Sequence, residues 1–360
     1  MPRIIAVGTA VPPYVITQEE ARRAAAEVFG RAFPDLDRRL DVFVNAGIER
    51  RHFSRPLEWY LTPHDFGERN RAYVETAVEL GALACRRCLA AAGASPADVD
   101  ALLFVSTTGL ATPSIDARLM DHLGLRRDIE RTPVWGLGCA GGAAGLARAA
   151  HVARARPRSL VLVLAVELCS LTFQWEERTK SNFVATALFA DGAAAVLVAG
   201  DDVVAGDRPA AGQPGGPAPA VLASHSYTWP DTLDVMGWEV SPRGLHVVFS
   251  RSIPSIVRRH VWVQTAAFLE RERVPLSAVS RFIVHPGGPK VLDAYRESFG
   301  LEEQHLLAAR EVLREYGNMS SPTVLFVLER ALREPPPPGA VGLVAALGPG
   351  FTSEQVILQW

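Results

Sequence analysis

The chain reads PVWGLGCAGGAAG from Pro133 to Gly145, and this stretch decides how we interpret the fold. A short apolar strand runs into glycines, then Cys139, then small residues that predict a helix through about Ala155. We therefore expect Cys139 at a helix N-terminus, where unpaired backbone N–H groups and the helix dipole lower the pKa of a thiol. Flanking glycines let a substrate carbonyl approach the backbone. From this stretch alone, Cys139 is interpreted equally well as a nucleophile or as a small cysteine buried in a packed turn.

Outward from this stretch, short β-rich runs alternate with alanine-rich helical stretches, which predicts an α/β fold with covered sheets. We expect the longest helix to end at Gly93, a C-terminal cap. The expected strands are Arg3–Val7, Ala101–Val105, Leu160–Val166, Ala193–Val198, Arg281–His285, Gly342–Ala346 and Gln355–Leu358. The expected helices are Phe66–Ala92, Pro254–Glu270 and Pro322–Arg333.

A segment rich in Gly, Pro and Ala, Ala205–Ala220, reads as a surface linker and divides the chain. It separates an N-terminal half, residues 1–204, which carries the cysteine, from a C-terminal half, residues 221–360. The halves resemble each other weakly, because Ala97–Val105 and Ala278–His285 both run from a polar turn into a buried strand. The resemblance indicates an internal duplication.

Composition narrows the class of protein. Of the 360 residues, 48% are hydrophobic and 21% are charged, enough apolar material for a sizeable core. A formal net charge of -2 gives no electrostatic reason to expect a nucleic acid partner. The most apolar run, Leu160–Val166, is far shorter than the roughly 20 residues that span a bilayer, and the N-terminus lacks a signal peptide pattern. Four cysteines do not form a disulfide framework, so we expect a cytoplasmic protein.

Two further segments carry polar residues at the ends of elements. Ile283–Pro289 places His285 where a strand breaks into a turn, and Tyr316–Pro322 places Asn318 on a turn before a helix. A histidine or an asparagine at such a position, taken alone, more often has a structural role than a catalytic one. With Cys139 they supply a nucleophile, a group that polarises it and a second hydrogen-bond donor. A thiolate beside a histidine can be acylated by a thioester, and two neutral donors could hold the enolate of a decarboxylated malonyl thioester. Because asparagine cannot act as a base, decarboxylative condensation is favoured over thiolase-type deprotonation.

These segments resemble signatures of the type III polyketide synthases, the chalcone synthase-like enzymes, in consistent order from about Ile4 to the end. The matching segments are GCAGG from Gly138, ALFADGAAA from Ala187, HPGGP from His285, YGNMSS from Tyr316 and GPG from Gly348. The resemblance implies a thiolase fold, a five-layer αβαβα arrangement of two duplicated halves. It also implies a homodimer, coenzyme A thioesters as substrates, and no metal or redox cofactor.

The resemblance also implies roles for single residues. Cys139 matches the acylated nucleophile, and His285 and Asn318 match the decarboxylation and oxyanion pair. Phe189 matches one of two gatekeeper phenylalanines between the coenzyme A tunnel and the cavity. Val247 stands where plant members carry the second gatekeeper, so we expect a wider passage here.

Other departures from the plant pattern bear on the starter. Thr112 stands in place of a methionine that plant enzymes reach across the dimer interface. Cys169 replaces a threonine, while Thr172 is retained. The smaller side chains of Val247 and Thr112 leave more volume in the cavity, and Cys169 adds an apolar wall. Both features favour a long aliphatic starter. The segment Asp234–Glu239 resembles bacterial members that make alkylresorcinols and alkylpyrones from fatty acyl starters.

The remaining site predictions concern the cavity and coenzyme A. We expect four further residues to line the cavity: Met236, Ser320, Gly348 and Pro349. Arg50 and Arg51 fall near the family's contacts to the coenzyme A phosphates, and ordinary surface charge is the alternative interpretation.

Two other functions fit parts of the pattern. An acyl-CoA-primed β-ketoacyl carrier-protein synthase shares the fold and the trio, but it needs a basic docking patch and lacks the GPG segment from Gly348. A non-catalytic acyl-CoA-binding homologue is a second alternative, and the intact trio argues against it. Cys85 and Cys88 have no second pair at zinc spacing, so we interpret them as core residues.

Overall fold

A computed structural model of the chain describes residues 1–30, 32–205 and 218–360. The predicted linker Ala205–Ala220 lies largely outside these described residues. The division into halves at 1–204 and 221–360 therefore stays a prediction as far as its boundaries are concerned.

Within the described residues, nine strands join in one mixed sheet in the order β11-β12-β13-β8-β1-β7-β6-β4-β5. They are β1 (Arg3–Ala10), β4 (Ala101–Val105), β5 (Glu130–Val134), β6 (Leu160–Leu168), β7 (Asp191–Ala199), β8 (Ala220–Thr228), β11 (Val279–Val284), β12 (Val341–Gly348) and β13 (Thr352–Gln359). Each of the seven strands expected from the sequence is present, most of them a few residues longer than predicted.

The sheet consists of two halves with the same topology. β1 and β8 pair at a single position, Arg3 with Ala220, which marks the join. On one side the order is β1-β7-β6-β4, and on the other it is β8-β13-β12-β11. In both halves the second pair is antiparallel and the third is parallel. The predicted duplication is thus confirmed strand by strand, with β5 added at one edge.

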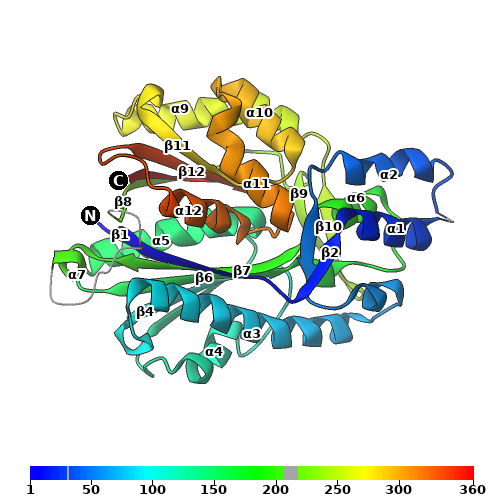
Figure 1. The fold of residues 1–360 in the computed structure, drawn as a ribbon, viewed down its shortest axis with the longest axis horizontal. Helices are drawn as coiled ribbons and strands as arrows, with labels where there is room; N and C mark the ends of the chain where they lie inside the picture. The colour runs from blue at the N-terminus through cyan, green and yellow to red at the C-terminus, as the bar shows by residue number, and fades with distance from the viewer. Residues whose placement is uncertain (31, 206–217) are drawn as a thin grey trace.

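Helices separate and cover the two halves of the sheet (Figure 1). α5 (Gly141–Ala155) and α12 (Thr323–Arg333) lie between them, and each contacts strands of both halves. α3 (Phe66–Ala92) and α4 (Ile115–Leu123) cover the outer face of the N-terminal half. α9 (Trp262–Arg271) and α10 (Pro289–Phe299) cover the C-terminal half. This order of layers is the predicted five-layer αβαβα thiolase arrangement.

The remaining elements gather mostly at one end of the layers, on the right of Figure 1. They are β2 (Tyr14–Thr17), β3 (Arg50–Phe53), α1 (Gln18–Phe29), α2 (Leu36–Val44), α6 (Lys180–Leu188), β9 (Met236–Ser241) and β10 (Gly244–Phe249). α6 contacts α1, α2 and β10, so this end forms a cap built from distant parts of the chain. Elsewhere lie α7 (Asp201–Ala205), α8 (Ile253–Ile256) and α11 (Leu307–Tyr316).

Local sequence explains where the predicted helices begin and end. α3 starts at a capping box, in which Asp65 accepts from the Glu68 N–H and Glu68 accepts from the Asp65 N–H. It ends at Gly93, whose φ of 63° is left-handed, as predicted. The helix predicted at Pro254–Glu270 is instead α8 and α9 joined by a π-helical turn at Val257–Val261.

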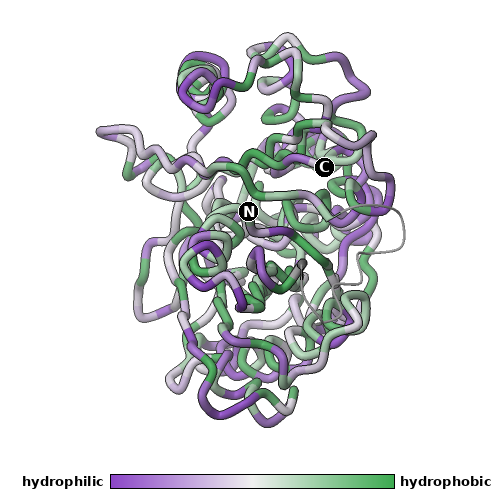
Figure 2. Tube along the Cα trace, turned by 90° about the vertical axis from the view of Figure 1, so that its left-hand side faces the viewer, coloured by the Kyte–Doolittle hydropathy of each residue, from purple (hydrophilic) through white to green (hydrophobic). Residues whose placement is uncertain are grey.

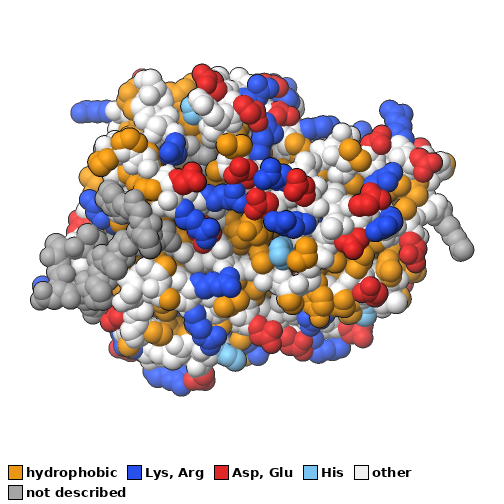
Figure 3. Space-filling model, viewed as in Figure 1, with side chains coloured by type: hydrophobic (Ala, Val, Ile, Leu, Met, Phe, Trp, Pro, Cys, Tyr) orange, Lys and Arg blue, Asp and Glu red, His pale blue; other side chains and the backbone are white. Residues whose placement is uncertain are grey.

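Hydrophobic stretches, green in Figure 2, run through the interior of the molecule, and β6 and β7 are buried along their whole lengths. On the face drawn in Figure 3, cations and anions are interspersed. Arg310 pairs with Asp293 and Arg330 pairs with Glu311. In the part of the chain that is described, no helix is both long and apolar enough to cross a membrane.

Candidate active site

Cys139 lies in a 3₁₀ turn, Gly138–Ala140, that leads directly into α5. The Gly138 N–H donates to the Thr107 Oγ1 at 3.1 Å, and Gly138 has a left-handed φ of 46°. A Cβ on Gly138 would lie 2.8 Å from Cδ of Pro349. Glycine is therefore required at this position both for its conformation and for contact with the loop after β12.

The small residues of the motif let the two halves of the fold touch backbone to backbone. A Cβ on Gly142 would lie 2.2 Å from the Ser321 carbonyl oxygen. A Cβ on Gly348 would lie 2.4 Å from the Leu137 carbonyl oxygen. These approaches place the nucleophile turn against the C-terminal half, and they put the predicted cavity residues Gly348 and Pro349 beside Cys139.

His285 and Asn318 meet at Gly287. His285 follows β11, is 4% exposed, and donates its backbone N–H to the Ala345 carbonyl at 2.8 Å. Asn318 donates from Nδ2 to the Gly287 carbonyl at 3.3 Å, and a Cβ on Gly287 would lie 3.7 Å from His285 Nε2. The Asn318 Oδ1 accepts from the Ser320 N–H at 2.8 Å, which orients the amide group.

The electrostatics of the trio differ from the sequence-based expectation. Burial raises the pKa of Cys139 to about 12, opposed by hydrogen bonds from the side chains of Ser320 and Asn318 and reinforced by the charge of Glu167. The prediction of a lowered pKa is therefore wrong for this site, because desolvation outweighs the helix N-terminus. Burial also lowers the pKa of His285 to about 3. Thiol and imidazole are both neutral at neutral pH, and the hydrogen bonds place Cys139, Asn318 and Ser320 together.

Glu167, in the middle of the site, was not predicted. It lies fully buried in β6 and accepts from the Thr107 N–H at 2.9 Å, the Thr108 hydroxyl at 2.8 Å and the Ser321 hydroxyl at 3.0 Å. Burial raises its pKa to about 7, although these hydrogen bonds oppose the shift. The signal that could have revealed it is a lone acid inside the apolar run Leu160–Leu168.

Replacing Glu167 by glutamine is expected to flatten the pH dependence of stability. The pKa of Glu167 rises from 4.5 to about 7 on folding. The stability that Glu167 adds to the folded state is therefore fully present below pH 4.5 and is lost as pH rises through 7. Each pKa unit corresponds to roughly 1.4 kcal/mol, so the free energy of unfolding of the native protein should fall by about 3 kcal/mol across this range relative to that of Glu167→Gln. Urea unfolding of both proteins at pH 5 and pH 8 measures the difference, and parallel curves would contradict the assignment.

Phe189 joins the trio to an aromatic cluster. The Asn318 N–H donates to the Leu188 carbonyl and the Ala190 N–H to the Asn318 carbonyl, both at 2.9 Å, so Phe189 pairs with Asn318. The Phe189 ring centroid lies 6.2 Å from that of Trp238 and 6.0 Å from that of Phe249. Sequence reasoning missed both partners. Phe249 stands two residues after Val247 and so shares its strand face.

Four of the predicted cavity residues line one pocket: Cys169, Thr172, Phe189 and Val247. The pocket continues between the cap elements, where its walls are largely apolar. Residues there include Ala21, Ala24, Ala25, Val28, Leu57 and Leu61. Because Phe189 lines the pocket and pairs with Asn318, the pocket adjoins the trio.

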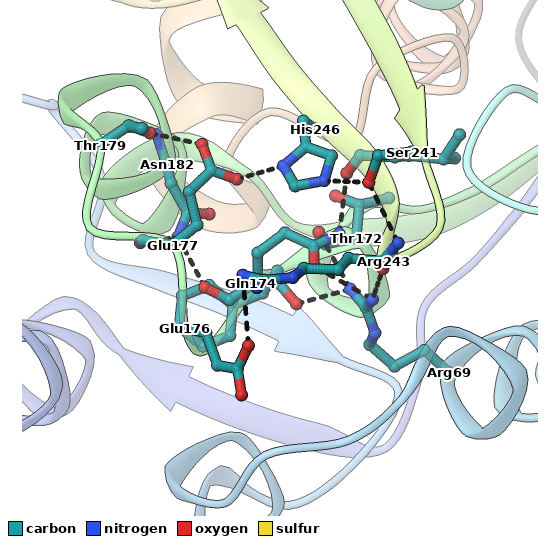
Figure 4. Close-up of polar contacts among 12 residues, drawn as sticks. Arg69, Thr172, Gln174, Glu176, Glu177, Thr179, Asn182, Ser241, Arg243 and His246 are labelled. Atoms are coloured by element: carbon teal, nitrogen blue, oxygen red, sulfur yellow. Dashed lines mark hydrogen bonds and ion pairs between the residues drawn. The ribbon is translucent and has the colours of Figure 1, made fainter.

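A polar network fixes one wall of this pocket (Figure 4). His246 lies between Glu177 Oε2 and Ser241 Oγ, 2.6 Å from each. Arg69 of α3 donates to the Phe173 carbonyl at 2.8 Å and also to the Arg243 carbonyl. The hairpin β9–β10, which carries Val247, is thus tied to both α3 and the segment before α6.

Other predicted residues lie elsewhere. Met236 is half-buried on β9 opposite Phe249, next to Gly237, which approaches Pro349. Thr112 is exposed in the single chain, and its role stays a prediction. Arg50 is exposed and stays a candidate for coenzyme A.

The structure corrects the prediction for Arg51. This residue is 0% exposed, and its guanidinium donates to the carbonyls of Thr186 and Phe189. Such burial contradicts a contact with a phosphate of coenzyme A. Cys85 and Cys88 are buried in the core, as predicted. No group of three or more metal-binding side chains occurs within residues 1–30, 32–205 and 218–360.

Comparison with known proteins covers nearly the whole chain. Residues 60–202 match the family described as chalcone and stilbene synthases, N-terminal domain, and residues 221–360 match its C-terminal domain. A 1,3,6,8-tetrahydroxynaphthalene synthase of Streptomyces peucetius is 40% identical over 99% of this chain and 93% of that protein. A 3,5-dihydroxyphenylacetyl-CoA synthase of Streptomyces toyocaensis is 33% identical over 100% of this chain and 90% of that protein.

A solved structure gives the same result. The 1,3,6,8-tetrahydroxynaphthalene synthase of Streptomyces coelicolor, described as a bacterial type III polyketide synthase, superposes with a TM-score of 0.91 at 29% identity. The superposition covers 99% of each chain.

Proposed function

The chain belongs to the type III polyketide synthases, the family of chalcone and stilbene synthases, and on this premise we propose a reaction for it. The chain takes a long-chain fatty acyl-CoA as starter, extends it by repeated decarboxylative condensation with malonyl-CoA, and cyclises the product to an alkylpyrone or alkylresorcinol. Cys139, His285 and Asn318 carry the chemistry.

The first step is transfer of the starter to Cys139. Because the thiol begins protonated, it must lose its proton as the thioester arrives, and the neutral imidazole of His285 is available to accept it. The sulfur bonds to the acyl carbon, the bond to coenzyme A breaks, and the departing thiolate regains the proton. The imidazole is neutral again at the end of the step.

The second step is condensation. Malonyl-CoA loses carbon dioxide, and the electron pair remains on the thioester as an enolate. The ring N–H of His285 and the amide of Asn318 would donate to the enolate oxygen. The enolate carbon then attacks the acyl group on Cys139 and displaces the sulfur. The displaced Cys139 thiolate takes up one proton from water, which offsets the malonyl carboxylate charge lost with carbon dioxide. Each cycle therefore balances without a redox partner.

The pocket beside the trio supports the long starter. Its largely apolar lining suits an alkyl chain, which gains about 0.8 kcal/mol for each buried methylene. Val247 and Cys169 are small residues of its lining, and alanines of α1 also line it.

A second candidate comes from the relatives. Those named above are called tetrahydroxynaphthalene and dihydroxyphenylacetyl-CoA synthases, so their products are small hydroxylated aromatics. A short product made from malonyl-CoA alone is therefore the competing function. The family match in both halves leaves no support for the carrier-protein synthase alternative.

The test is incubation with malonyl-CoA and a panel of acyl-CoAs, namely short, aromatic and C8 to C18, followed by mass spectrometry. Pyrones or resorcinols that carry the long alkyl chain, absent with Cys139→Ala, support the proposal. A polyhydroxylated aromatic formed from malonyl-CoA alone, with no use of long starters, would replace it by the second candidate.

Replacing Val247 by phenylalanine is expected to shift starter preference toward shorter chains. The larger ring would fill the pocket entrance, so the ratio of kcat/KM for a C16 starter to that for a C8 starter should fall by about tenfold, or roughly 1.4 kcal/mol. Val248→Phe is the matched control, because neighbouring strand residues face opposite sides and Val248 is absent from the pocket lining. Equal profiles for the two variants would refute the role of Val247.

We also propose that the chain forms a homodimer through β5. This strand ends the sheet order in the described residues, and most of its residues are exposed. Next to it, Trp135 is 51% exposed, and Leu110, after β4, is 44% exposed. An exposed strand edge with apolar neighbours is suited to pairing with a second copy. Sedimentation velocity should give a dimer, and Trp135→Arg should shift it toward monomer; a monomeric native protein would exclude the assembly.

A further inference from the structure

Arg51 is fully buried among the elements of the cap. It lies on β3 with no exposed surface, and its Cζ is 5.2 Å from the centre of the Phe53 ring. A Cβ on Gly317 would lie 2.7 Å from Cγ of Arg51 and 2.8 Å from its Cδ, and Gly317 has a left-handed φ of 70°. The Arg51 side chain therefore packs directly against the backbone of the residue before Asn318.

The guanidinium binds the turn that carries Phe189. Its Nη1 donates to the Thr186 carbonyl at 2.7 Å and to the Phe189 carbonyl at 2.8 Å. Phe189 caps the C-terminus of α6, so one nitrogen ties the last turn of this helix to the start of β7. Nε and Nη2 have no hydrogen-bond partner within the described residues. Burial lowers the pKa of Arg51 to about 9, and the nearby charge of Asp191 opposes this shift. Burying a guanidinium is costly, so the two carbonyl bonds must compensate much of this cost.

The turn that Arg51 holds is the one that holds Asn318. The Asn318 N–H donates to the Leu188 carbonyl, and the Ala190 N–H donates to the Asn318 carbonyl, both at 2.9 Å. Arg51 therefore reaches Asn318 by two routes, one through Phe189 and its pairing and one through Gly317. Arg51 also lines the pocket, but neither route to Asn318 runs through the pocket.

We propose that Arg51 is a positioning residue, which sets Asn318 at the place where its amide donates to the enolate oxygen. The inference rests on the role of Asn318 in the proposed function. Misplacement of a catalytic group by about 1 Å can cost on the order of 100-fold in rate. Removal of the guanidinium would free the Leu188–Ala190 turn and, with it, the backbone of Asn318.

A double-mutant cycle tests this role. Arg51→Met keeps an apolar stem but removes both donated hydrogen bonds, and it is measured in the native protein and in Asn318→Ala. Malonyl-CoA decarboxylation should fall by about 100-fold in the native background, with KM unchanged, and by less than about threefold when Asn318 is already absent. The same factor in both backgrounds would overturn the proposal, because Arg51 would then act on the fold.

Two further variants separate positioning from stability. Arg154 also donates to two backbone carbonyls, those of Val221 and Leu222, but lies outside the site, so Arg154→Met should leave the rate unchanged. Arg51→Lys can satisfy one of the two carbonyls and should recover about tenfold of the loss. If Arg51→Met does not fold, the cycle is run with Arg51→Lys, and an equal factor in both backgrounds again overturns the proposal.

The outcome for Asn318→Ala alone keeps the two proposals distinct. Full activity in that variant would refute the proposed role of Asn318 in the reaction. A large loss with Asn318→Ala, together with additive behaviour of Arg51→Met, would refute only the positioning role of Arg51.

Discussion

Replacing Cys139 by alanine is expected to abolish every condensed product while decarboxylation of malonyl-CoA remains measurable. Without the sulfur no acyl group can be held, so product formation should fall by a factor on the order of 10⁴ or more. The groups that would stabilise the enolate, His285 and Asn318, do not depend on the thiol for their position, since both are oriented through Gly287 and neighbouring backbone.

Two assays on the same protein measure this separation. Mass spectrometry follows the condensed products, and release of labelled carbon dioxide follows decarboxylation. Cys85→Ala is the control, because Cys85 is also fully buried but lies in α3, away from the site. Condensed products from Cys139→Ala above the background without enzyme would refute its role as nucleophile. Simultaneous loss of both reactions would instead indicate that the thiol takes part in decarboxylation.

The sequence predicted the positions of the trio because each residue stands at the end of an element. The glycines around Cys139 indicate a close approach of backbone, and the structure shows what they approach: the carbonyl of Ser321 and the side chain of Pro349. The repeat of polar turn and buried strand likewise reflects a real duplication of topology.

The sequence did not predict how deeply the residues of the site are buried. A cysteine at a helix start suggests a lowered pKa, but the degree of desolvation around Cys139 depends on contacts between the two halves that no local pattern contains. Glu167 was overlooked for the same reason: its partners Thr107 and Ser321 come from distant segments.

The assignment of Arg50 and Arg51 to one ligand was avoidable. Successive side chains of a strand point to opposite faces, so two adjacent arginines on β3 cannot both face a phosphate. Arg50 is exposed and Arg51 is buried, as this alternation requires. Adjacent residues in a strand should therefore be assigned to different environments before a shared function is considered.

Replacing Asn318 by alanine is expected to have the opposite pattern from Cys139→Ala. Removal of one oxyanion donor costs about 10² to 10³ in rate, so decarboxylation of malonyl-CoA should fall by this factor. Acylation of Cys139 in a single turnover, followed as a mass increase of the intact protein, should fall by less than about tenfold, because His285 remains to accept the thiol proton. Asn70→Ala is the control, since within the described residues the Asn70 side chain bonds only the backbone of Leu110.

His285→Gln divides the two roles of the imidazole. A glutamine can donate to the enolate oxygen but cannot accept the thiol proton, so acylation of Cys139 should fall further than decarboxylation. Since burial lowers the pKa of His285 to about 3, the donor in the native site is a neutral ring, which an amide can imitate. If Asn318→Ala slowed acylation and decarboxylation equally, the amide would be positioning the thioester and not the enolate. If His285→Gln lost only decarboxylation, the proton acceptor for Cys139 would be another group. Glu167 is then the candidate, because its charge acts on Cys139 and its pKa is about 7.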